Sequence, residues 1–347
     1  MGSALMKANI MRGHGGLEQV VFGEIDLPRI QPGFVLVRTR AAALNHLDLF
    51  VLGGLPGDTL EMPHVLGSDG AGVVEVVGEG VAKYSPGDRV MLNPVLSCGH
   101  CEFCVQGEDN MCVRLTLVGE GAKGTYAEFF MVPEANLEKV PDGVSFQSAA
   151  AFSLVFQTAW RMLVTRARIR SGDDVFIHGI GGGVSSAALQ VAKLAGGRVF
   201  VSSSSNVKLE RAKELGADFC YNYSEADVLG EVIKETEKRG VDIVVDSVGA
   251  ATWRQSLKLV RKGGKIVTCG ATTGSSPKTD IGLIFWKHVE ILGSTMGSRF
   301  EYKTLVKLLG EGKLKPVIDK KFHLSEGKEA LKYLQEEKQF GKVVLVT

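Results

Sequence analysis

The sequence predicts an α/β protein of two domains, in which a doubly wound parallel sheet follows a β-rich region. Residues 7 to about 150 contain short β-rich runs that end in turn residues, such as Val35–Thr39 and Arg89–Leu92. From Asp174 onward, buried strands alternate with helices of about 10–15 residues, which is the pattern of βαβ units and hence of a parallel sheet. The length of 347 residues suits two domains.

The β-rich region is expected to contain further strands at Gly72–Val77 and Gly124–Val132, and Ser148–Val164 has helical spacing of its apolar residues. In the α/β region we expect the strands Asp174–Ile177, Arg198–Val201, Phe219–Tyr221, Val241–Val245 and Lys265–Cys269, with the helices Ser185–Leu194, Val207–Leu215, Glu225–Lys238 and Thr252–Val260 between them. The tail, roughly residues 290–347, is too short to form a domain. We expect it to add one strand, two helices and a last strand, Lys342–Val346, to one of the other regions.

The charge balance excludes several classes of protein. Lysine and arginine number 40 against 39 aspartates and glutamates, and no basic stripe stands out, so we expect no nucleic-acid partner. The longest apolar runs, such as Ala149–Phe156, are far shorter than the ~20 residues that cross a membrane. The N-terminus lacks the charged and apolar regions of a signal peptide, so we expect a cytoplasmic protein.

The segment Ile177–Ser185 is a glycine-rich turn between a strand and a helix. In this context, glycines such as Gly181, Gly182 and Gly183 let the backbone approach a pyrophosphate, whose charge is stabilised at the helix N-terminus beside Val184. Ser185 takes the place of the last glycine of the usual pattern. The turn therefore predicts a dinucleotide site, and a glycine turn that binds nothing is the alternative.

The strand after this turn ends in a run of serines. An NAD site has an acidic residue about 20 residues past the glycines, which binds the ribose 2′-hydroxyl. Here Ser203 and Ser204 stand in that region and Lys208 follows, so hydroxyls and a cation are available for a 2′-phosphate. The pattern predicts NADP(H). The serines can also cap the following helix, and both roles can hold at once.

Four of the six cysteines crowd into fifteen residues with the spacing C-x2-C-x2-C-x7-C. Cys98, Cys101, Cys104 and Cys112 can supply the four thiolates of a closed, tetrahedral zinc site. An iron–sulfur cluster, a redox switch and chance clustering are the alternatives. His100 lies inside the run, but four cysteines leave it no position as a ligand.

With these motifs, the chain resembles the medium-chain, zinc-type alcohol dehydrogenases over nearly its whole length. The segment Gly67–Gly72, the cysteine run and the glycine turn carry the resemblance. It implies a GroES-like catalytic domain over residues 1–150, with a zinc lobe at 94–115 and completed by 290–347, and a Rossmann domain over 151–289. It also implies a homodimer or homotetramer, with Val289–Leu292 where the family pairs its Rossmann domains.

The chain departs from this family at the catalytic zinc. The family holds that ion with a cysteine in a C-x-[ST]-D-x-H segment, a histidine in a G-H-E segment, and a cysteine or acid before the Rossmann domain. Asn45, Ser68 and Leu154 stand at those positions, and Leu47 and Phe50 replace the proton relay. These departures resemble the zinc-independent branch, which includes quinone oxidoreductases and enone reductases.

The resemblance also implies the site residues. Asn45 and Ser68 are expected to donate hydrogen bonds to the oxygen that becomes negative during hydride transfer, with Asp69 orienting one of them; alternatively, Asn45 and Ser68 are structural. Besides the glycine turn, the cofactor is expected to be lined by His46, Thr158, Tyr223, Ser247, Gly270, Ala271, Ser294, Met296 and Lys342. Phe50, Leu154, Phe156 and Trp286 are expected to form an apolar substrate wall, or to be ordinary core residues.

The expected function is an NADPH-dependent oxidoreductase that transfers hydride to a ketone, aldehyde, enone or quinone without a catalytic zinc. A conjugated enone or quinone spreads the developing negative charge, so it needs less help from a metal than a simple ketone does. A non-catalytic NADPH-binding sensor or scaffold, which kept the cofactor fold after losing the metal, is the alternative.

Overall fold

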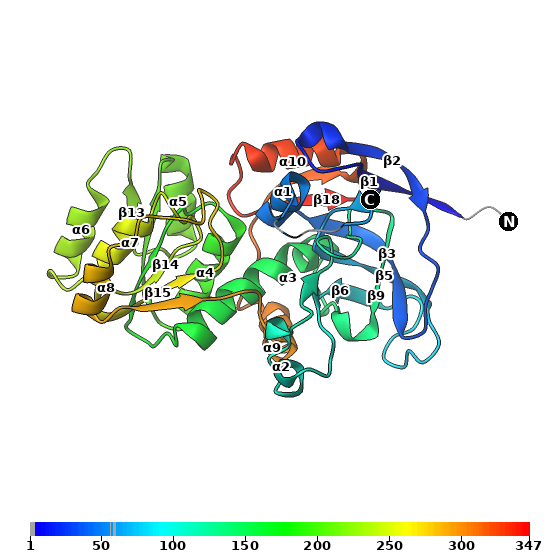
Figure 1. The fold of residues 1–347 in the computed structure, drawn as a ribbon, viewed down its shortest axis with the longest axis horizontal. Coiled ribbons are helices and arrows are strands. Elements are labelled where there is room, and N and C mark those ends of the chain that lie inside the picture. The colour runs from blue at the N-terminus through cyan, green and yellow to red at the C-terminus, as the bar shows by residue number, and fades with distance from the viewer. Residues whose placement is uncertain (1–3, 56, 58–59) are drawn as a thin grey trace. The chain divides into compact units, whose positions relative to one another are not determined.

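A computed structural model of the chain describes residues 4–55, 57 and 60–347 (Figure 1). The chain forms two compact units. Residues up to Leu154, together with Ser298–Thr347, form the first unit, and Val155–Gly297 form the second. The second boundary lies beyond the expected limit at residue 290, because the strand Glu290–Gly293 pairs within the second unit. No helix among the described residues is long and apolar enough to span a membrane.

The second unit is built on a six-stranded parallel sheet. Its strands are β11 (Asp174–Ile177), β12 (Arg198–Ser203), β13 (Phe219–Asn222), β14 (Val241–Val245), β15 (Val260–Thr268) and β16 (Glu290–Gly293). Its helices are α4 (Gly183–Leu194), α5 (Asn206–Glu214), α6 (Val228–Glu235), α7 (Trp253–Leu259) and α8 (Ile281–Lys287).

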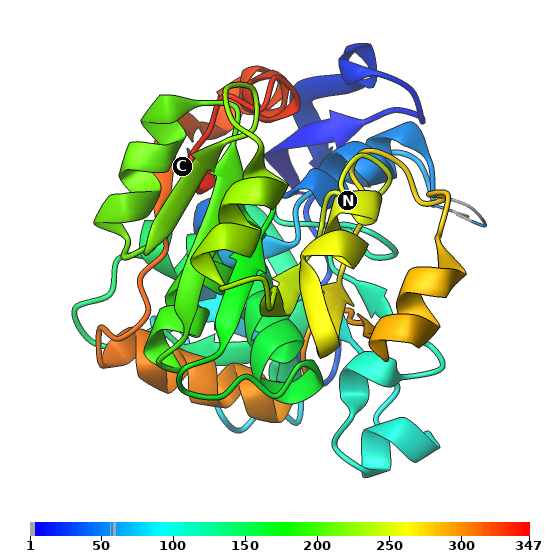
Figure 2. The ribbon, with the colours of Figure 1, turned by 90° about the vertical axis from the view of Figure 1, so that its left-hand side faces the viewer.

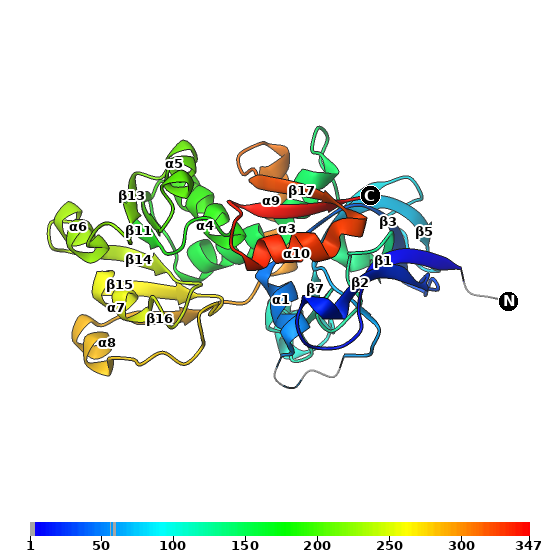
Figure 3. The same cartoon turned by 90° about the horizontal axis from the view of Figure 1, so that it is seen from above.

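The strand order in this sheet is β13-β12-β11-β14-β15-β16 (Figure 3). Along the chain, β12 and β13 are added on one side of β11, and β14, β15 and β16 are then added on its other side. Since parallel crossovers are right-handed, this reversal puts the connecting helices on both faces of the sheet, as Figure 2 shows. The predicted doubly wound sheet is confirmed. Its switch point lies between β11 and β14, where such sheets bind ligands at the carboxyl ends of the strands.

The first unit is β-rich. Its strands are β1 (Leu5–Met11), β2 (Val20–Asp26), β3 (Phe34–Ala43), β4 (His64–Val65), β5 (Asp69–Val77), β6 (Arg89–Leu92), β7 (Val95–Leu96), β8 (Thr116–Leu117), β9 (Phe129–Pro133), β10 (Leu137–Lys139), β17 (Ile318–His323) and β18 (Lys342–Val346). Its helices are α1 (His46–Gly53), α2 (Glu102–Val105), α9 (Arg299–Gly310) and α10 (Gly327–Gln335), and α3 (Phe146–Trp160) runs across the boundary of the two units.

The C-terminal tail completes the main sheet of the first unit. This sheet has the order β10-β6-β5-β3-β18-β17, with β9 also paired to β3. The last strand, β18, pairs antiparallel with β3, so residues about 300 positions apart in the chain lie side by side (Figure 1). This pairing brings Lys342 of β18 close to the residues that follow β3.

Several expected elements differ from the structure. Strand β9 begins only at Phe129, because the backbone of Gly124–Tyr126 bonds to residues 65–67 instead of continuing the ladder. Helix α6 is shorter than expected and covers Val228–Glu235, since Glu237 and Lys238 have positive φ. The helix at Ser148–Val164 ends at Trp160 and continues as a π-helical turn. No residue range was predicted for the strands β1, β2, β4, β7, β8, β10 and β17 or for the helices α1, α2 and α8.

A network of charges joins the amino ends of the strands in the second unit. Asp242 accepts hydrogen bonds from Arg239 (2.7 Å), from Arg261 (2.5 Å) and from the backbone of Asp174 (2.9 Å). Asp174 in turn binds Arg198 through two bonds of 2.6 and 3.0 Å. Burial by itself would raise the pKa of Asp242, but the two guanidinium groups outweigh it and hold this pKa far below its usual range.

Asp242→Asn is expected to lower the free energy of unfolding by about 1–3 kcal/mol, because two guanidinium groups lose their carboxylate partner. Because the pKa of Asp242 is lower in the folded than in the unfolded protein, its carboxylate contributes fully to stability above the unfolded pKa of about 4. This contribution is lost as the pH falls further, towards the folded pKa. Denaturant unfolding at pH 7 and pH 3.5 measures the difference. Asp142→Asn, at an exposed aspartate, is the control; an equal effect of both variants would contradict the assignment.

Candidate active site

The glycine-rich turn lies between β11 and α4, at the carboxyl end of the central strand. Gly179 and Gly181 have φ angles of +63° and +139°, which favour glycine. The hydroxyl of Ser185 donates to the carbonyl oxygens of Gly179 and Gly182, each at 3.1 Å. The serine that replaces the third glycine therefore connects the backbone at two points of the turn through its hydroxyl. The backbone amides at the start of α4 suit a pyrophosphate.

The serine run and Lys208 lie beside this turn. A Cβ built on Gly181 would come within 2.8 Å of Lys208 Cδ and 3.3 Å of its Nζ, so the lysine side chain covers the turn. Ser203 is buried at the end of β12, and its hydroxyl accepts from the backbone of Ser205 at 3.2 Å. Ser205 caps α5 by accepting from the backbone of Lys208 at 3.4 Å. One serine thus caps the helix, while Ser203, Ser204 and Lys208 stand beside the turn.

The other expected cofactor residues of the second unit gather at the same edge of its sheet. Five of them follow the carboxyl ends of the strands β13 to β16. They are Tyr223 after β13, Ser247 after β14, Gly270 and Ala271 after β15, and Ser294 after β16. Met296 has a positive φ of 51° and accepts a hydrogen bond from Thr158 at 3.7 Å. The hydroxyl of Ser294 has no hydrogen-bond partner among the described residues. These residues and the glycine cradle fit a dinucleotide.

A buried polar cluster in the first unit contains three of the expected site residues. The ammonium of Lys342 donates to Asn45 Oδ1 at 2.5 Å and to Asp69 Oδ2 at 2.9 Å. The amide of Asn45 donates to Asp69 Oδ2 at 2.9 Å, and the backbone of Leu154 donates to Asp69 Oδ1 at 2.9 Å. All three side chains are buried. We call Asn45, Asp69 and Lys342 the Asn45 cluster.

Local structure explains why these side chains meet. Asn45 lies between the end of β3 and the start of α1, and its backbone amide donates to Asp48 Oδ2 at 2.7 Å, as at many helix N-termini. Gly67 has a φ of +104°, and a Cβ there would come within 2.4 Å of the Tyr126 ring. Only glycine therefore lets the chain pass under this ring and turn into β5 at Asp69.

The residues at the three family positions for a catalytic zinc do not fit that ion. Asn45 and Ser68 offer only neutral oxygens, and Leu154 offers an apolar side chain. The oxygens of Asp69 already accept bonds from Lys342, Asn45 and Leu154. A divalent cation would also meet the Lys342 ammonium. Among the described residues, the cysteine run is the only group of three or more candidate metal ligands.

Ser68 differs from its neighbours because it is buried but unpaired. Its side chain is fully buried, and its hydroxyl has no hydrogen-bond partner within the described part of the chain. Such a hydroxyl is costly unless something bonds to it.

His46 opens α1, and burial lowers the pKa of its imidazole, so it is neutral near pH 7.

The four expected wall residues divide between the two units. Phe50, on α1, is partly exposed, and Leu154 is buried in the first unit. Phe156 is fully buried, as a core residue would be, whereas Trp286 on α8 is largely exposed and its ring lies 5.8 Å from Lys262 Nζ. Two of the four expected wall residues are thus buried as core residues are, and two are exposed, so the substrate wall stays a prediction.

The four cysteines of the run lie together between β7 and β8. Their sulfur atoms are all within 4.8 Å of one another, close to the S···S spacing of about 3.8 Å around a tetrahedral zinc. The backbone amides of Cys101 and Cys98 donate to Cys98 and Cys112, at 3.3 and 3.2 Å. Backbone hydrogen bonds lower the pKa of Cys98 to about 5, whereas burial raises the pKa of Cys104 to about 11. The lobe fits a structural zinc.

His100 is not part of this sulfur group. Its Nδ1 lies 2.8 Å from the carbonyl oxygen of Cys98, and its Nε2 lies 2.8 Å from the guanidinium of Arg114. The lobe is attached to α9 by Arg299, whose backbone donates to Asp109 at 2.9 Å and whose guanidinium donates to Ser97 at 3.0 Å.

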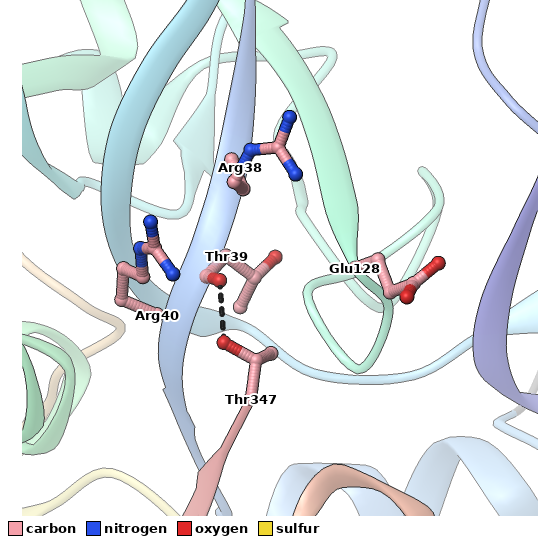
Figure 4. Close-up of a pocket in the computed structure, with 5 residues that line it drawn as sticks. All are labelled: Arg38, Thr39, Arg40, Glu128 and Thr347. Atoms are coloured by element: carbon pink, nitrogen blue, oxygen red, sulfur yellow. Dashed lines mark hydrogen bonds between the residues drawn. The ribbon is translucent and has the colours of Figure 1, made fainter. Parts of the chain in front are cut away.

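A shallow pocket of about 150 Å³ lies elsewhere in the first unit and is lined by Arg38, Thr39, Arg40, Glu128 and Thr347 (Figure 4). The Thr347 hydroxyl donates to the carbonyl oxygen of Thr39 at 2.8 Å. None of the expected site residues lines this pocket, so we do not include it in the candidate site.

The fold and the site define a dinucleotide-binding oxidoreductase. Comparison with known proteins agrees. Residues 31–142 match the family model described as alcohol dehydrogenase GroES-like domain, and residues 183–311 match the one described as zinc-binding dehydrogenase. An acryloyl-coenzyme A reductase from Metallosphaera sedula is 33% identical over 344 residues, which cover 99% of this chain and 100% of the relative.

Solved structures give the same result. One described as an NAD-dependent alcohol dehydrogenase is 45% identical, with a TM-score of 0.95, and the match covers 99% of this chain and 100% of that chain. A cobalt- and zinc-bound thermostable alcohol dehydrogenase from Pyrobaculum aerophilum is 33% identical, with a TM-score of 0.90 and the same two coverages. The chain belongs to the medium-chain dehydrogenase/reductase superfamily and is an NAD(P)-dependent oxidoreductase. The resemblance inferred from the sequence is confirmed.

Elemental analysis of the purified protein is expected to find one zinc ion per chain, held by the cysteine lobe. Cys101→Ser removes one ligand and should lower the zinc affinity by more than about 100-fold, together with the melting temperature. Cys220→Ser, in β13 of the second unit, is the matched control and should keep the zinc. Two zinc ions per wild-type chain would contradict the conclusion that the Asn45 cluster does not fit a metal.

Proposed function

We propose that this protein is an NADPH-dependent reductase that transfers hydride to a conjugated acceptor, such as an α,β-unsaturated carbonyl compound or a quinone, without a catalytic zinc. The observation that carries the proposal is the Asn45 cluster. Its carboxylate and amide bond to each other and to an ammonium, so no Lewis acid is available to polarise a simple ketone. A conjugated acceptor spreads the negative charge over several atoms and needs less stabilisation. The relative named acryloyl-coenzyme A reductase supports an activated carbon–carbon double bond as the acceptor.

Ser68 is the side chain best suited to meet the developing charge. When bound, the reduced nicotinamide supplies the hydride, and the electrons it delivers increase the charge on the acceptor oxygen. The buried, unpaired Ser68 hydroxyl can donate to that oxygen without breaking an existing bond. The Asn45 amide already donates to Asp69, so Asn45 serves mainly to hold the cluster in place.

The Lys342 ammonium acts on the same site as a fixed positive charge. It is buried beside Asn45 and Asp69, where a positive charge interacts more strongly with a nearby oxyanion than it would in water. Its two partners hold it in one position. In this proposal Lys342 therefore positions the cluster, whereas Ser68 contacts the acceptor.

Self-association is part of the proposal. β16 is the last strand of its sheet, so one of its edges has no neighbouring strand in the described chain. Ile281, Phe285 and Trp286 on α8 expose apolar side chains close to it in sequence. An open strand edge and exposed apolar side chains support an interface with a second copy of the chain.

Ser68→Ala is expected to lower kcat for enone reduction by about 100-fold with little change in KM, because it removes a donor that is needed mainly in the transition state. Stopped-flow absorbance of NADPH and identification of the product measure this. Ser325→Ala, at an exposed serine, is the control. A saturated ketone as product supports the proposal, and an unsaturated alcohol would mean attack at the carbonyl group instead.

Turnover decides between the proposal and its rival. If the wild-type protein binds NADPH tightly but reduces no enone, quinone, ketone or aldehyde, the protein is a non-catalytic NADPH-binding sensor or scaffold, and the proposed reductase is wrong.

Lys208→Ala is expected to raise KM for NADPH by about 10- to 100-fold and to leave KM for NADH unchanged, since a charged hydrogen bond to the 2′-phosphate is worth about 1.5–3 kcal/mol. Steady-state kinetics with both cofactors measures this. Lys213→Ala, on the same helix but paired with Glu210, is the matched control. If Lys208→Ala weakens NADPH and NADH equally, Lys208 contacts the pyrophosphate and the preference for NADPH is unsupported.

A further inference from the structure

Asp246 is a buried carboxylate that the proposed function does not use. It follows β14 at the carboxyl end of the sheet of the second unit and is fully buried. Its Oδ1 accepts hydrogen bonds from the backbone amides of Val248 and Gly249, both at 3.0 Å, and from the Thr252 hydroxyl at 2.8 Å. These bonds close the loop that contains Ser247, one of the expected cofactor residues.

Ser256 connects this carboxylate to the residue before the glycine turn. Its hydroxyl, on α7, donates to Asp246 Oδ2 in its shortest contact, at 2.6 Å, and its oxygen lies 2.9 Å from His178 Nε2. A hydroxyl has a single proton, and here Asp246 accepts it. The contact with His178 is therefore a hydrogen bond in which His178 Nε2 donates and the Ser256 oxygen accepts.

Burial keeps the imidazole of His178 neutral. The side chain is 1% exposed, and burial lowers its pKa to about 4, although the charge of Asp246 acts in the opposite direction. A neutral imidazole has one ring proton, which the bond to Ser256 places on Nε2. The ring also packs edge-on against Phe176, with the two centroids 4.7 Å apart. Because His178 directly precedes Gly179, these contacts fix the point at which the glycine turn begins.

The loops that carry the expected cofactor residues also pack directly on one another. A Cβ on Gly179 would lie 3.3 Å from Val248 Cγ2, so the glycine turn lies against the loop after β14. A Cβ on Gly249 would lie 2.9 Å from Ala271 Cα, and the backbone of Thr273 donates to the carbonyl oxygen of Val248 at 2.8 Å. The loops after β11, β14 and β15 therefore form one packed group at the switch point of the sheet.

We propose that Asp246, Ser256 and His178 are positioning residues of the dinucleotide site, which hold the glycine turn in a fixed place relative to the loop that carries Ser247. The pyrophosphate is expected at this turn, and the loop after β14 lies on the other side of the switch point. A dinucleotide that contacts both needs them at one spacing, and a spacing fixed before binding lowers the cost of binding. The inference goes beyond the proposed function, because it depends neither on the acceptor nor on Ser68.

Ser256→Ala is expected to raise the Kd for NADPH and the Kd for NADH by the same factor, about 10-fold, because it removes the connection between Asp246 and His178 but keeps both groups. Fluorescence titration of the zinc-loaded protein measures both constants without any acceptor. With an acceptor that is turned over, kcat at saturating cofactor should change by less than about 2-fold, since no group that contacts the acceptor is altered.

Thr236→Val is the matched control. Thr236 is also buried in the second unit, and its hydroxyl donates to the Val232 carbonyl oxygen at 2.7 Å and accepts from the backbone of Gly240 at 3.1 Å. It lies before β14, at the opposite end of the strand from Asp246. Both variants should lower the melting temperature, and only Ser256→Ala should weaken cofactor binding. Equal weakening by both variants, or none by Ser256→Ala, would overturn the proposal.

Two substitutions of His178 test the direction of the hydrogen bond. His178→Gln keeps an N–H donor at the end of the side chain and should leave the Kd for NADPH within about 3-fold of the wild-type value. His178→Leu has no donor and should raise this Kd as Ser256→Ala does. A glutamine variant that binds as weakly as the leucine variant, or a leucine variant that binds like wild type, contradicts the proposal. If either fails to fold, Ser256→Ala, which deletes one oxygen atom, decides alone.

Nitrogen-15 NMR of the histidine side chains gives a measurement that needs neither cofactor nor acceptor. The His178 signal, identified by its absence in His178→Gln, should show a neutral imidazole with its proton on Nε2 near pH 7, and Ser256→Ala should shift this signal. A proton on Nδ1, or a charged imidazole, overturns the inference. Tight NADPH binding without turnover on any acceptor refutes the proposed function instead and leaves the role of Asp246, Ser256 and His178 standing.

Discussion

Lys342 comes from the last strand of the chain and Asp69 from the first residue of β5, and their side chains meet in the interior of the first unit at 2.9 Å. Removing two charges from water costs several kcal/mol per ion, and this cost is offset only where each charge has further good partners. Here the ammonium also bonds to Asn45, and the carboxylate also accepts from Asn45 and from the backbone of Leu154. One ion pair thus holds the segment after β3, the start of β5, helix α3 and the C-terminal strand together.

The same ion pair limits the chemistry of the site. The Asp69 oxygens already accept bonds from Lys342, Asn45 and Leu154. Asn45, Ser68 and Leu154 themselves offer only an amide, a hydroxyl and an apolar side chain. Ser68 is left as the buried donor without a partner among the described residues. In the proposed function, such a site suits an acceptor whose negative charge is delocalised. The cysteine lobe, which fits a structural zinc, is separate from this cluster, because its sulfur atoms form their own group.

Features set by short stretches of chain could be predicted from the sequence. The glycine turn, the strands β6, β11 and β14, and the cysteine spacing depend on neighbouring residues, and the structure has them where they were expected. The strand expected at Gly124–Val132 was wrong in its first half, because residues 124–126 bond to residues 65–67, which no local pattern reveals. The hydrogen bond between Asp48 and Tyr126 was missed for the same reason. A buried Asp in a helical first turn looks like an ordinary helix cap until its distant partner is known.

The sequence by itself determined the class of fold, the dinucleotide turn, the zinc lobe and the absence of the usual catalytic ligands, because each depends on residue type and spacing along the chain. Only the tertiary structure decided where the Lys342 ammonium goes. The resemblance to the alcohol dehydrogenases implied that this lysine lines the cofactor. Yet pairing of β18 with β3 brings its Nζ within hydrogen-bonding distance of Asn45 and Asp69. The reason is physical: a buried charge is stabilised by whichever opposite charge the fold brings beside it, and that neighbour is set by strand pairing rather than by sequence distance.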